Sequence, residues 1–335
     1  MAGAAWLIMP LLALGLDALL GDPRGWPHPV RFIGLALDKL EIQARIWAGK
    51  PTLAGERKTA FADMESRRLR WAGLAAVVLV AGGSGLLVYI FSSLPGAGWL
   101  VALYFAYAGL ALHGLIHEVD RARQILRLEG AEAGREAVSR LVSRDVSAAE
   151  DDDLYRALAE TLAENFNDAV IAPFFWLCLA GPAGLWAYKA VSTMDSMWGY
   201  KNERWRDLGR AAARLDDLLA WIPARLSAAF LRFTPTGEKL GAWPGWAIIA
   251  GQADAMASPN AGWPMAVAAW LHGRSMGGPT LYHGEMVEKP HLGPAAAPVW
   301  DSVSLARLLR HIRRAAPAGC LTVWLAWGCV ALLIS

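Results

Sequence analysis

The chain contains apolar runs long enough to cross a lipid bilayer, and they constrain its fold more than any other feature. These runs cover residues 4–20, 71–91, 99–116 and 318–334. A bilayer core of about 30 Å needs roughly 20 apolar residues in helical form, and a helix satisfies its own backbone groups in lipid. The chain is also 55% hydrophobic with 17 Trp and a mean hydropathy of +0.30. The sequence therefore predicts an all-α, polytopic integral membrane protein.

Basic residues in the connections predict the orientation of these runs. Ten Lys and Arg lie within residues 21–70 and seven Arg within 118–168, whereas the turn at 92–98 has none. Lys and Arg concentrate in cytoplasmic loops. We therefore expect 21–70, 118–168 and most of 191–316 to be cytoplasmic, with the N-terminus outside. The whole chain, 1–335, is predicted to form a single membrane-embedded domain.

A fifth apolar stretch, residues 169–190, poses a topological problem. A single crossing would place the basic segment 201–214 outside. The stretch is interrupted near its middle by the sequence GPAG at 181–184, and non-helical backbone is tolerated at membrane depth where protein shields it. We expect a re-entrant helical hairpin that returns both ends to the cytoplasm. A plain crossing, with 218–233 returning, is the alternative.

The remaining segments predict helices outside the membrane core. Residues 204–233 have an amphipathic helical pattern that Pro223 interrupts. Residues 241–293 are rich in Gly, Pro and Trp, so we expect ordered loops and short helices there. Residues 302–314 form a basic amphipathic pattern that predicts an anchor at the membrane surface.

A first polar cluster precedes the central apolar stretch. Glu160, Glu164 and Asp168 follow the spacing i, i+4, i+8, and Asn165 lies beside them. This spacing places the three carboxylates on one helical face, where they repel one another. A bound cation or a basic partner would relieve that repulsion. A solvated helix end is the other interpretation.

A second polar cluster follows the same stretch. It mixes acids, bases and amides more densely than anchoring at a membrane edge requires. Lys and Arg side chains can hold phosphate groups, and carboxylates can hold Mg²⁺ or position an amine. A juxtamembrane belt of paired charges is the alternative. The candidate residues here are Lys189, Asp195, Tyr200, Lys201, Asn202, Glu203, Arg204, Asp207, Arg214 and Asp217.

A third polar cluster is the proline-rich segment GDPRGWPHPVRFIG at 21–34, which presents Asp22, His28 and Arg31. A rigid polar loop at the mouth of a membrane cavity suits a ligand, although a simple basic stop after a membrane helix would look similar. The sequence has no GxxxxGK[ST] or kinase motif. Its net charge of +2 is spread along the chain, which argues against a nucleic acid partner.

Several of these segments together resemble one known family. The resemblance rests on GDPRGWPHPVRFIG, RDVS at 144–147, AENFNDAVIAPFFW, the stretch from YKAVSTMDSMWGYKNERWRDLG to AWIPARLSA, SPNAGWPMA and YHGEMVEKP. They look like the CobD/CbiB family, the adenosylcobinamide-phosphate synthases of cobalamin biosynthesis. The likeness covers about residues 11–315. One departure is Asn167, where the family more often has Ser.

The resemblance implies a multi-pass enzyme of the bacterial inner membrane with its active site facing the cytoplasm. Such an enzyme uses ATP and Mg²⁺ to join aminopropanol phosphate, or free aminopropanol, to the propionate carboxyl of adenosylcobyric acid. The implied product is adenosylcobinamide phosphate. Other enzymes of the same biosynthesis are implied as possible partners, besides membrane lipid.

The resemblance also implies roles for individual residues. Mg²⁺ binding or general base catalysis is expected of Glu164, Asp168 and Asp195, and catalytic contacts to phosphate of Lys189 and Lys201. ATP and substrate binding is expected of Asp22, His28, Arg31, Asn165, Tyr200, Asn202, Glu203, Arg204, Asp207, Arg214, Asp217, Ser258, Asn260, Glu285 and Lys289.

Two other classes of protein share part of this pattern. An AmpE-like membrane sensor would be expected to lack part of the KNER and SPNAGWP sequences, which are both present here. A transporter with broken helices fits the Gly-Pro interruption, but it commonly shows inverted repeats, and the sequence shows none.

Overall fold

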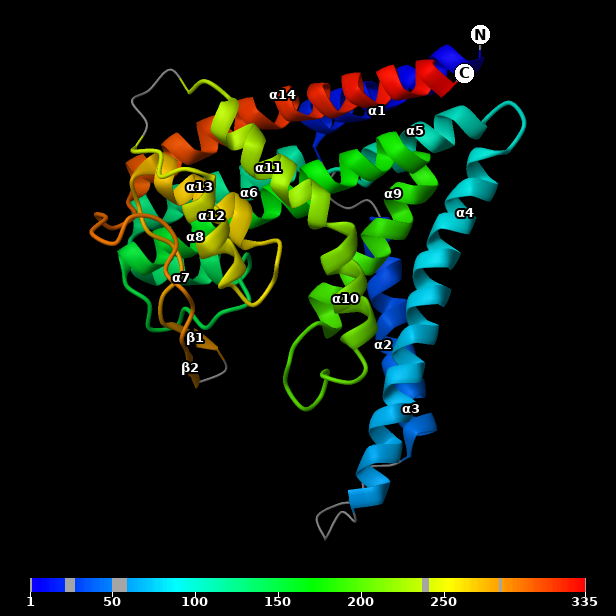
Figure 1. Cartoon of the computed structure of the whole chain (residues 1–335), viewed down its shortest axis with the longest axis horizontal. Coiled ribbons are helices and arrows are strands. Elements are labelled where there is room, and N and C mark those ends of the chain that lie inside the picture. The colour runs from blue at the N-terminus through cyan, green and yellow to red at the C-terminus, as the bar shows by residue number, and fades with distance from the viewer. Residues whose placement is uncertain (1, 22–27, 50–58, 237–240, 283–284, 335) are drawn as a thin grey trace. The chain divides into compact units, whose positions relative to one another are not determined.

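The computed structural model describes residues 2–21, 28–49, 59–236, 241–282 and 285–334 (Figure 1). Most of this described part is helical and very little of it is strand, which confirms the all-α prediction. The α-helices are α1 (Ala2–Leu20), α2 (Pro29–Ala48), α3 (Thr59–Val77), α4 (Gly83–Ser92), α5 (Gly98–Ala108), α6 (Leu112–Glu129), α7 (Ala131–Ser139), α8 (Asp151–Phe166), α9 (Ala172–Trp198), α10 (Arg210–Leu219), α11 (Trp221–Phe233), α12 (Trp246–Asp254), α13 (Gly262–His272) and α14 (Ser302–Ile334).

Two π-helical turns and one hairpin complete the described structure. The π-turns η1 (Val78–Gly82) and η2 (Asn167–Ile171) join α3 to α4 and α8 to α9 without a break in the helical path. Strands β1 (Thr280–Tyr282) and β2 (Glu285–Val287) form an antiparallel pair in which Leu281 faces Met286. The sequence did not predict this hairpin.

The chain divides into two compact units, each built from three separate stretches. Unit 1 contains the described residues of 1–13, 23–109 and 176–219, and unit 2 contains those of 14–22, 110–175 and 220–335. Because the stretches interleave along the chain, no linker or change in composition marks a boundary. This division is therefore hard to foresee from a sequence that predicts one domain.

Four helical paths in the described residues are long and apolar enough to cross a membrane. They are Asp63–Ser92, Gly98–Glu129, Asp151–Trp198 and Ser302–Leu333. They contain three of the predicted runs and the central stretch 169–190. The first predicted run falls on α1, whose apolar part is shorter than these four, so its crossing stays a prediction.

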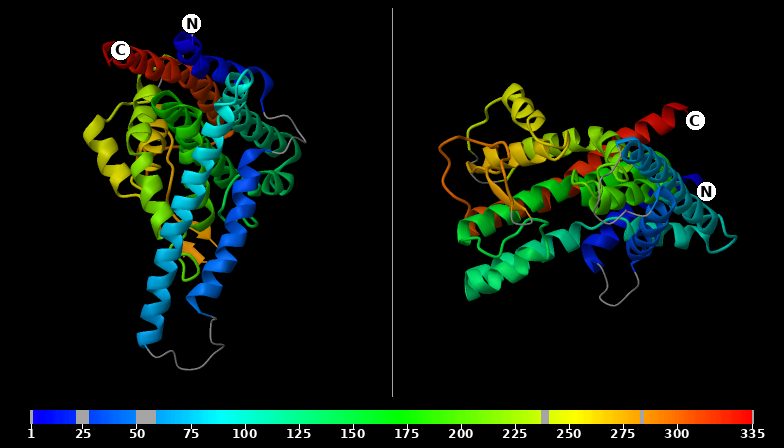
Figure 2. Two further views of the ribbon diagram at one scale, coloured as in Figure 1. Left: turned by 90° about the vertical axis from the view of Figure 1, so that its right-hand side faces the viewer. Right: turned by 90° about the horizontal axis from the view of Figure 1, so that it is seen from below.

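Helices α3 and α4 form the longest rod of unit 1. Figures 1 and 2 show α2 running alongside α3, and the buried side chains of α2 recur at Ile33, Leu37, Glu41 and Ala44. This spacing places one face of α2 against α3. Helix α5 follows α4 after a short turn and contacts it.

The apolar path from α5 to α6 is broken, whereas the sequence predicted an uninterrupted span at 99–116. Ala111 has a non-helical backbone (φ −149°, ψ 41°). Its N–H donates to the carbonyl of Ala169 in η2 at 3.1 Å. The buried Asp17 carboxylate accepts from the first N–H of α6, that of Leu112, at 2.9 Å. The break is stable because another helix supplies its acceptors, and no local sequence signal reveals that.

Helix α9 is sharply bent at Ala180 and Gly181 (Figure 1). Gly181 has a φ of 65°, a conformation that a side chain would strain. The rings of Trp176 and Tyr188 stack with centroids 6.5 Å apart, although a straight helix would separate these residues by about 18 Å. The two arms of α9 therefore fold towards each other at the predicted interruption. Whether they make a re-entrant hairpin or a crossing in lipid stays a prediction.

Two predicted segments differ from the structure. The surface helix 302–314 and the span 318–334 form one helix, α14, with Pro317 inside it. The predicted helix 204–233 is instead a loop followed by α10 and α11, and these two helices separate at Ala220. Pro223 does not interrupt the helix because it lies in the first turn of α11, where no intrahelical N–H bond is lost.

Helix α8 lies at the centre of unit 2. Its fully buried side chains include Leu154, Leu158, Leu162 and Phe166, and it packs against α6, α7, α13 and α14. The three aspartates in its first turn interact favourably with the positive end of the helix dipole. The two glutamates of the first polar cluster are thus carried by a helix that packs against four others, and Asp168 lies in the π-turn that follows it.

A histidine pair lies where α13 meets α14. Nε2 of His272 lies 3.1 Å from Nδ1 of His311. Burial lowers the pKa of His272 to about 3, and the neighbouring His311, Arg307 and Arg274 lower it further. This histidine is therefore neutral in the folded protein at every pH near neutrality.

Acidification should destabilise the fold through His272. His272 takes up a proton near pH 6.5 in the unfolded chain and only near pH 3 in the folded chain. Its contribution to the free energy of unfolding is therefore complete above pH 6.5 and is lost as the pH falls towards 3. The loss should approach about 1.4 kcal/mol per pH unit. Thermal unfolding in detergent from pH 7 to pH 4 measures it. His272→Gln should show a shallower pH dependence, and equal dependences would contradict this assignment.

Candidate functional site

The predicted site residues divide between the two units, and each group is described by itself. Unit 2 carries Glu164, Asn165, Asp168, Ser258, Asn260, Glu285 and Lys289. Unit 1 carries His28, Arg31, Lys189, Asp195, Tyr200, Lys201, Asn202, Glu203, Arg204, Asp207, Arg214 and Asp217. Asp22 lies outside the described residues.

The two glutamates of α8 and Asp168 of η2 lie close together, as the spacing predicted. Glu164 lies within electrostatic range of both Glu160 and Asp168, and also of the cations Lys289 and Arg144. Glu160 is buried, whereas Glu164 is exposed and Asp168 is partly exposed. The face therefore changes from a buried acid to two accessible acids along its length.

Glu160 is a structural member of this face. Its Oε2 forms an ion pair with Arg144, and its Oε1 accepts a hydrogen bond from the backbone N–H of Gly277 at 2.7 Å. Burial alone would lower the pKa of Arg144, but Glu160 outweighs burial and raises that pKa overall. With both carboxylate oxygens engaged, Glu160 fixes α8 against the chain that leads into the β-hairpin.

Asp168 is positioned by the π-turn η2. Nδ2 of Asn167 donates to Oδ1 of Asp168 at 2.7 Å, and Oδ1 of Asn167 accepts from Oγ of Ser227 on α11 at 3.1 Å. Asn167 is buried, so its side-chain amide makes both hydrogen bonds shielded from water. Single π-turns inside α-helices are frequent at functional sites.

The β-hairpin brings a cation to the accessible acids. Nζ of Lys289 donates to the hydroxyl of Tyr282 at 2.5 Å and lies 4.7 Å from the centre of its ring. Lys289 also acts electrostatically on Glu164. Glu285 faces Tyr282 across the hairpin and is exposed. Asn165 on α8 donates to the carbonyl of Thr161 at 2.9 Å.

The SPNAGWP sequence forms the turn before α13. Asn260 is buried, and its Oδ1 accepts from Arg225 of α11 at 3.3 Å. The backbone N–H of Asn260 donates to Oγ of Ser258 at 3.3 Å. The Arg225 guanidinium lies over the rings of Trp221 and Trp263, at 4.2 and 4.7 Å. These contacts shape the turn, so Asn260 has a structural role besides any contact with a ligand.

In unit 1 the candidate loop, residues 199–209, is held by close glycine contacts. A Cβ on Gly209 would overlap the carbonyl of Trp198, and one on Gly73 of α3 would overlap the carbonyl of Leu208. The rings of Trp198 and Trp205 stack with centroids 5.9 Å apart. The loop is therefore fixed at both ends to helices of the unit.

Arg204 is tied to α2 instead of pointing away from the protein. Its Nε and Nη2 donate to the two oxygens of Glu41 at 3.0 and 2.9 Å. Arg45 also donates to Glu41, at 2.8 Å, and both guanidinium groups lie over Trp205. Burial raises the pKa of Glu41, but hydrogen bonds from Arg204 and Arg45 outweigh it and lower that pKa overall. This pairing indicates that Arg204 positions the loop.

Asp207 is engaged in the same way, since its Oδ1 accepts from Nε of Arg70 at 2.7 Å. The stretch that precedes Arg204 is different. Tyr200, Lys201, Asn202 and Glu203 are all exposed. The loop thus presents four polar side chains on a fixed backbone, and these are its best candidates for contact with a substrate.

The other predicted residues of unit 1 lie on its helices. His28 caps α2 by accepting from the N–H of Val30 at 3.3 Å, and its ring lies 6.4 Å from that of Trp186 on α9. Arg31 is exposed in the first turn of α2. The second arm of α9 carries Lys189 and Asp195, both partly buried. Helix α10, which carries Arg214 and Asp217, packs against α3.

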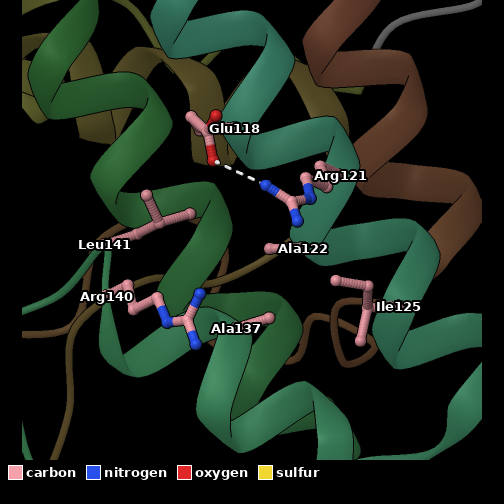
Figure 3. A pocket seen from close by; sticks show the side chains of 7 residues that line it. All are labelled: Glu118, Arg121, Ala122, Ile125, Ala137, Arg140 and Leu141. Atoms are coloured by element: carbon pink, nitrogen blue, oxygen red, sulfur yellow. Dashed lines mark ion pairs between the residues drawn. The ribbon is translucent and has the colours of Figure 1, made fainter. Parts of the chain in front are cut away.

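A small pocket between α6 and α7 contains none of these residues (Figure 3). Glu118 and Arg121, 4.0 Å apart, lie on its α6 side, with Arg140 on the opposite side. The pocket encloses about 50 Å³, which suits a few water molecules. It is too small for a nucleotide or a corrin ring.

The described residues contain no group of three or more His, Cys, Asp or Glu side chains arranged to hold a metal ion. Glu164 and Asp168 nevertheless supply two carboxylates on one face. Mg²⁺ commonly uses one or two carboxylates together with phosphate oxygens of the substrate and water. These two residues therefore fit Mg²⁺ that arrives with a nucleotide. Asp195 belongs to unit 1, so a three-carboxylate site with it stays a prediction.

Sequence reasoning missed several residues that build these groups. Arg144 lies in the recognised RDVS sequence, and Ser227 lies in the recognised AWIPARLSA sequence, yet neither was selected as a site residue. Tyr282 likewise lies in the recognised YHGEMVEKP sequence, together with its partner Lys289. Glu41 carried no separate signal, because its partner Arg204 is far away along the chain. A buried acid such as Glu160 requires a cation, and that requirement could have pointed to Arg144.

The contact of Gly73 with Leu208 gives a direct test of how the loop is held. Gly73→Ala should displace the loop and destabilise the protein by about 1–3 kcal/mol, the usual cost of overpacking. Gly83→Ala is the control because its Cβ would meet nothing within 4 Å. Thermal unfolding measures both variants. Equal effects would contradict a tight contact at Gly73.

The fold and these groups define a class: a polytopic, all-α membrane protein with dense acidic and basic clusters on two units. The family model described as CobD/Cbib protein matches residues 10–315. The chain belongs to this family.

Curated relatives carry matching names. The chain is 37% identical to the cobalamin biosynthesis protein CobD of Streptococcus sanguinis (strain SK36), over 88% of this chain and 89% of the relative. It is 38% identical to CobD of Stutzerimonas stutzeri (strain A1501), over 85% and 87%. It is 36% identical to the cobalamin biosynthesis protein CbiB of Salmonella typhimurium (strain LT2), over 87% of each. No solved structure matches the chain.

Proposed function

We propose that the protein is an ATP-dependent amide ligase of cobalamin biosynthesis. It joins the amine of aminopropanol phosphate, or of free aminopropanol, to the propionate carboxyl of adenosylcobyric acid and forms adenosylcobinamide phosphate or its dephosphorylated counterpart. The observation that carries the proposal is the family match over residues 10–315, together with relatives named for cobalamin biosynthesis. The accessible acids and neighbouring cations of unit 2 suit the chemistry.

Amide formation from a free carboxylate needs a leaving group. In the proposed reaction a propionate oxygen attacks the γ-phosphorus of ATP, which gives an acyl phosphate and ADP. The amine nitrogen then attacks the acyl carbon, the bond from carbon to the phosphate oxygen breaks, and inorganic phosphate leaves. The incoming ammonium first gives one proton to a base, and its second proton leaves with phosphate.

The residues of unit 2 supply the groups for the amine step. Glu164 and Asp168 are the candidate bases because they are accessible carboxylates beside cations. A positioned base commonly contributes 10²- to 10⁴-fold to the rate. Lys289 and Arg144 lie close enough to Glu164 to offset negative charge. Mg²⁺ binding is the alternative role for either carboxylate, and the ion would neutralise charge on the transferred phosphate.

The exposed part of the loop in unit 1 suits phosphate or the amide-rich rim of the corrin. Lys201 is a point charge for phosphate, and Asn202 offers both a donor and an acceptor to corrin amides. Similar roles are proposed for Lys189 and Arg214 towards ATP, for His28 and Arg31 towards aminopropanol phosphate, and for Asn260 and Glu285 towards the corrin. The protein is proposed to lie in the bacterial inner membrane with these groups facing the cytoplasm, where ATP is available.

A turnover assay on the purified protein in detergent tests the proposal. The assay contains adenosylcobyric acid, ATP, Mg²⁺ and either aminopropanol or its phosphate, and mass spectrometry follows the corrin products and ADP. We expect an amide product and one ADP for each amide formed. Formation of AMP in place of ADP would indicate an acyl adenylate intermediate instead of an acyl phosphate. The absence of product with both amines, from protein with a cooperative unfolding transition, would overturn the proposal.

Replacement of Asp168 should separate catalysis from folding. Asp168→Asn keeps the shape of the side chain and removes the base, so turnover should fall at least 100-fold. Membrane insertion and the unfolding temperature should change little. Glu129→Gln, an exposed acid at the end of α6, is the control and should keep its turnover. Near-normal turnover of the Asp168 variant would remove this residue from the mechanism.

Replacement of Lys201 should affect turnover more than replacement of its neighbour Arg206. Both are exposed cations of the same loop, so they match in charge and exposure, although Arg206 also lies 3.8 Å from Asp207. Lys201→Ala should lower kcat/KM by about 100-fold or more if it binds phosphate in the transition state, and Arg206→Ala should lower it only slightly. Equal effects of the two changes would indicate a general charge effect.

A further inference from the structure

One exposed stripe of α14 changes from basic to apolar along the helix. Arg307, Arg310 and Arg314 are exposed at spacings of three and four residues, which places them on one side of the helix. Leu321 and Leu325 continue the same stripe and are 45% and 51% exposed. Because α14 is one continuous helix, its chemistry changes within about 10 Å between Arg314 and Leu321.

The basic half of this stripe contains no acidic residue, and Asp301 caps the helix just before it begins. From residue 302 to residue 335 the sequence contains four Arg and neither Asp nor Glu. The fourth arginine, Arg313, is also exposed. This stretch therefore carries a concentrated positive charge immediately beside an apolar surface of membrane length.

An aromatic group lies beside the basic half. The ring of Trp246 lies 6.4 Å from that of Phe233 and 5.0 Å from that of Trp243. The Arg232 guanidinium lies over Trp243 at 4.7 Å. Phe233 and Trp246 are 69% and 38% exposed. Aromatic side chains with an apolar body and a polar edge favour the level of the lipid headgroups.

A direct contact joins the aromatic group to the arginine stripe. Nη1 of Arg314 donates to the carbonyl of Thr236, which follows α11 closely. Helix α11 also packs against α14 (Figure 1). Arg314 of α14 therefore lies on the same patch of unit 2 as Phe233 at the end of α11 and its neighbours Trp243 and Trp246.

We propose that this patch binds the headgroups of anionic phospholipids. The boundary near Pro317 marks the level at which the bilayer begins on α14, with Leu321 and Leu325 towards the acyl chains. The arginines then lie at the level of the lipid phosphates, where bidentate guanidinium contacts are favourable. Charge complementarity and continuity with an apolar surface argue for a lipid as the occupant. This inference does not depend on the proposed ligase activity.

Native mass spectrometry of the purified protein in a neutral detergent tests the proposal. Phosphatidylglycerol is titrated into the protein and retained lipid is counted, with phosphatidylcholine as the uncharged comparison. We expect preferential retention of phosphatidylglycerol. Arg310→Gln combined with Arg314→Gln should weaken its retention roughly 20-fold, because each basic residue near the surface contributes about 5-fold. Inorganic phosphate at millimolar concentration should not displace the lipid.

Arg121→Gln combined with Arg127→Gln is the matched control. It removes the same charge from exposed positions on α6 of the same unit and should leave lipid retention unchanged. Thermal unfolding in lipid-free detergent checks that both double variants are folded. Equal retention of the two lipids, an unchanged α14 variant, or an equal loss in the control would overturn the proposal.

Discussion

Backbone groups inside a membrane protein must find partners within the protein, and the structure satisfies this constraint at its least regular points. The apolar path between α5 and α6 breaks, and the N–H of Ala111 bonds to Ala169 of the π-turn. The first N–H of α6 bonds to the buried Asp17. The break before α6 and the π-turn η2 are thus joined by a hydrogen bond, and Asp17 satisfies the first N–H of α6. The accessible acids of α8 lie beside this interlocked region.

The polar clusters combine rigid and accessible members. Glu160, Arg204 and Asp207 are bound to other parts of their own unit, and they hold α8 and the loop 199–209 in place. Glu164 and residues 200–203 remain exposed. Such a division suits a site in which some charged residues orient the backbone and their neighbours contact the substrate. The sequence alone placed both kinds in one category, because composition does not distinguish a paired arginine from an exposed one.

Features that depend on local spacing could be predicted, and those that depend on distant partners could not. The membrane-length helices, the carboxylate face of α8 and the interruption at Gly181 all follow from periodicity or from one residue's conformational preference. The break before α6 depends on Asp17, and the fixed position of Arg204 depends on Glu41; both partners lie far away along the chain. The interleaved units and the short β-hairpin also arise from tertiary packing.

The π-turn at Asn167–Ile171 has an evolutionary consequence. A π-turn is equivalent to one residue inserted into a regular helix, so loss of one residue there would restore an ordinary α-helix. That loss would rotate α9 about 100° against α8 and move it along the axis. Asp168 would then leave its bond to Asn167, and Ala169 would no longer meet Ala111. Chain length between α8 and α9 should therefore be invariant among relatives that share this arrangement, even where the side chains differ.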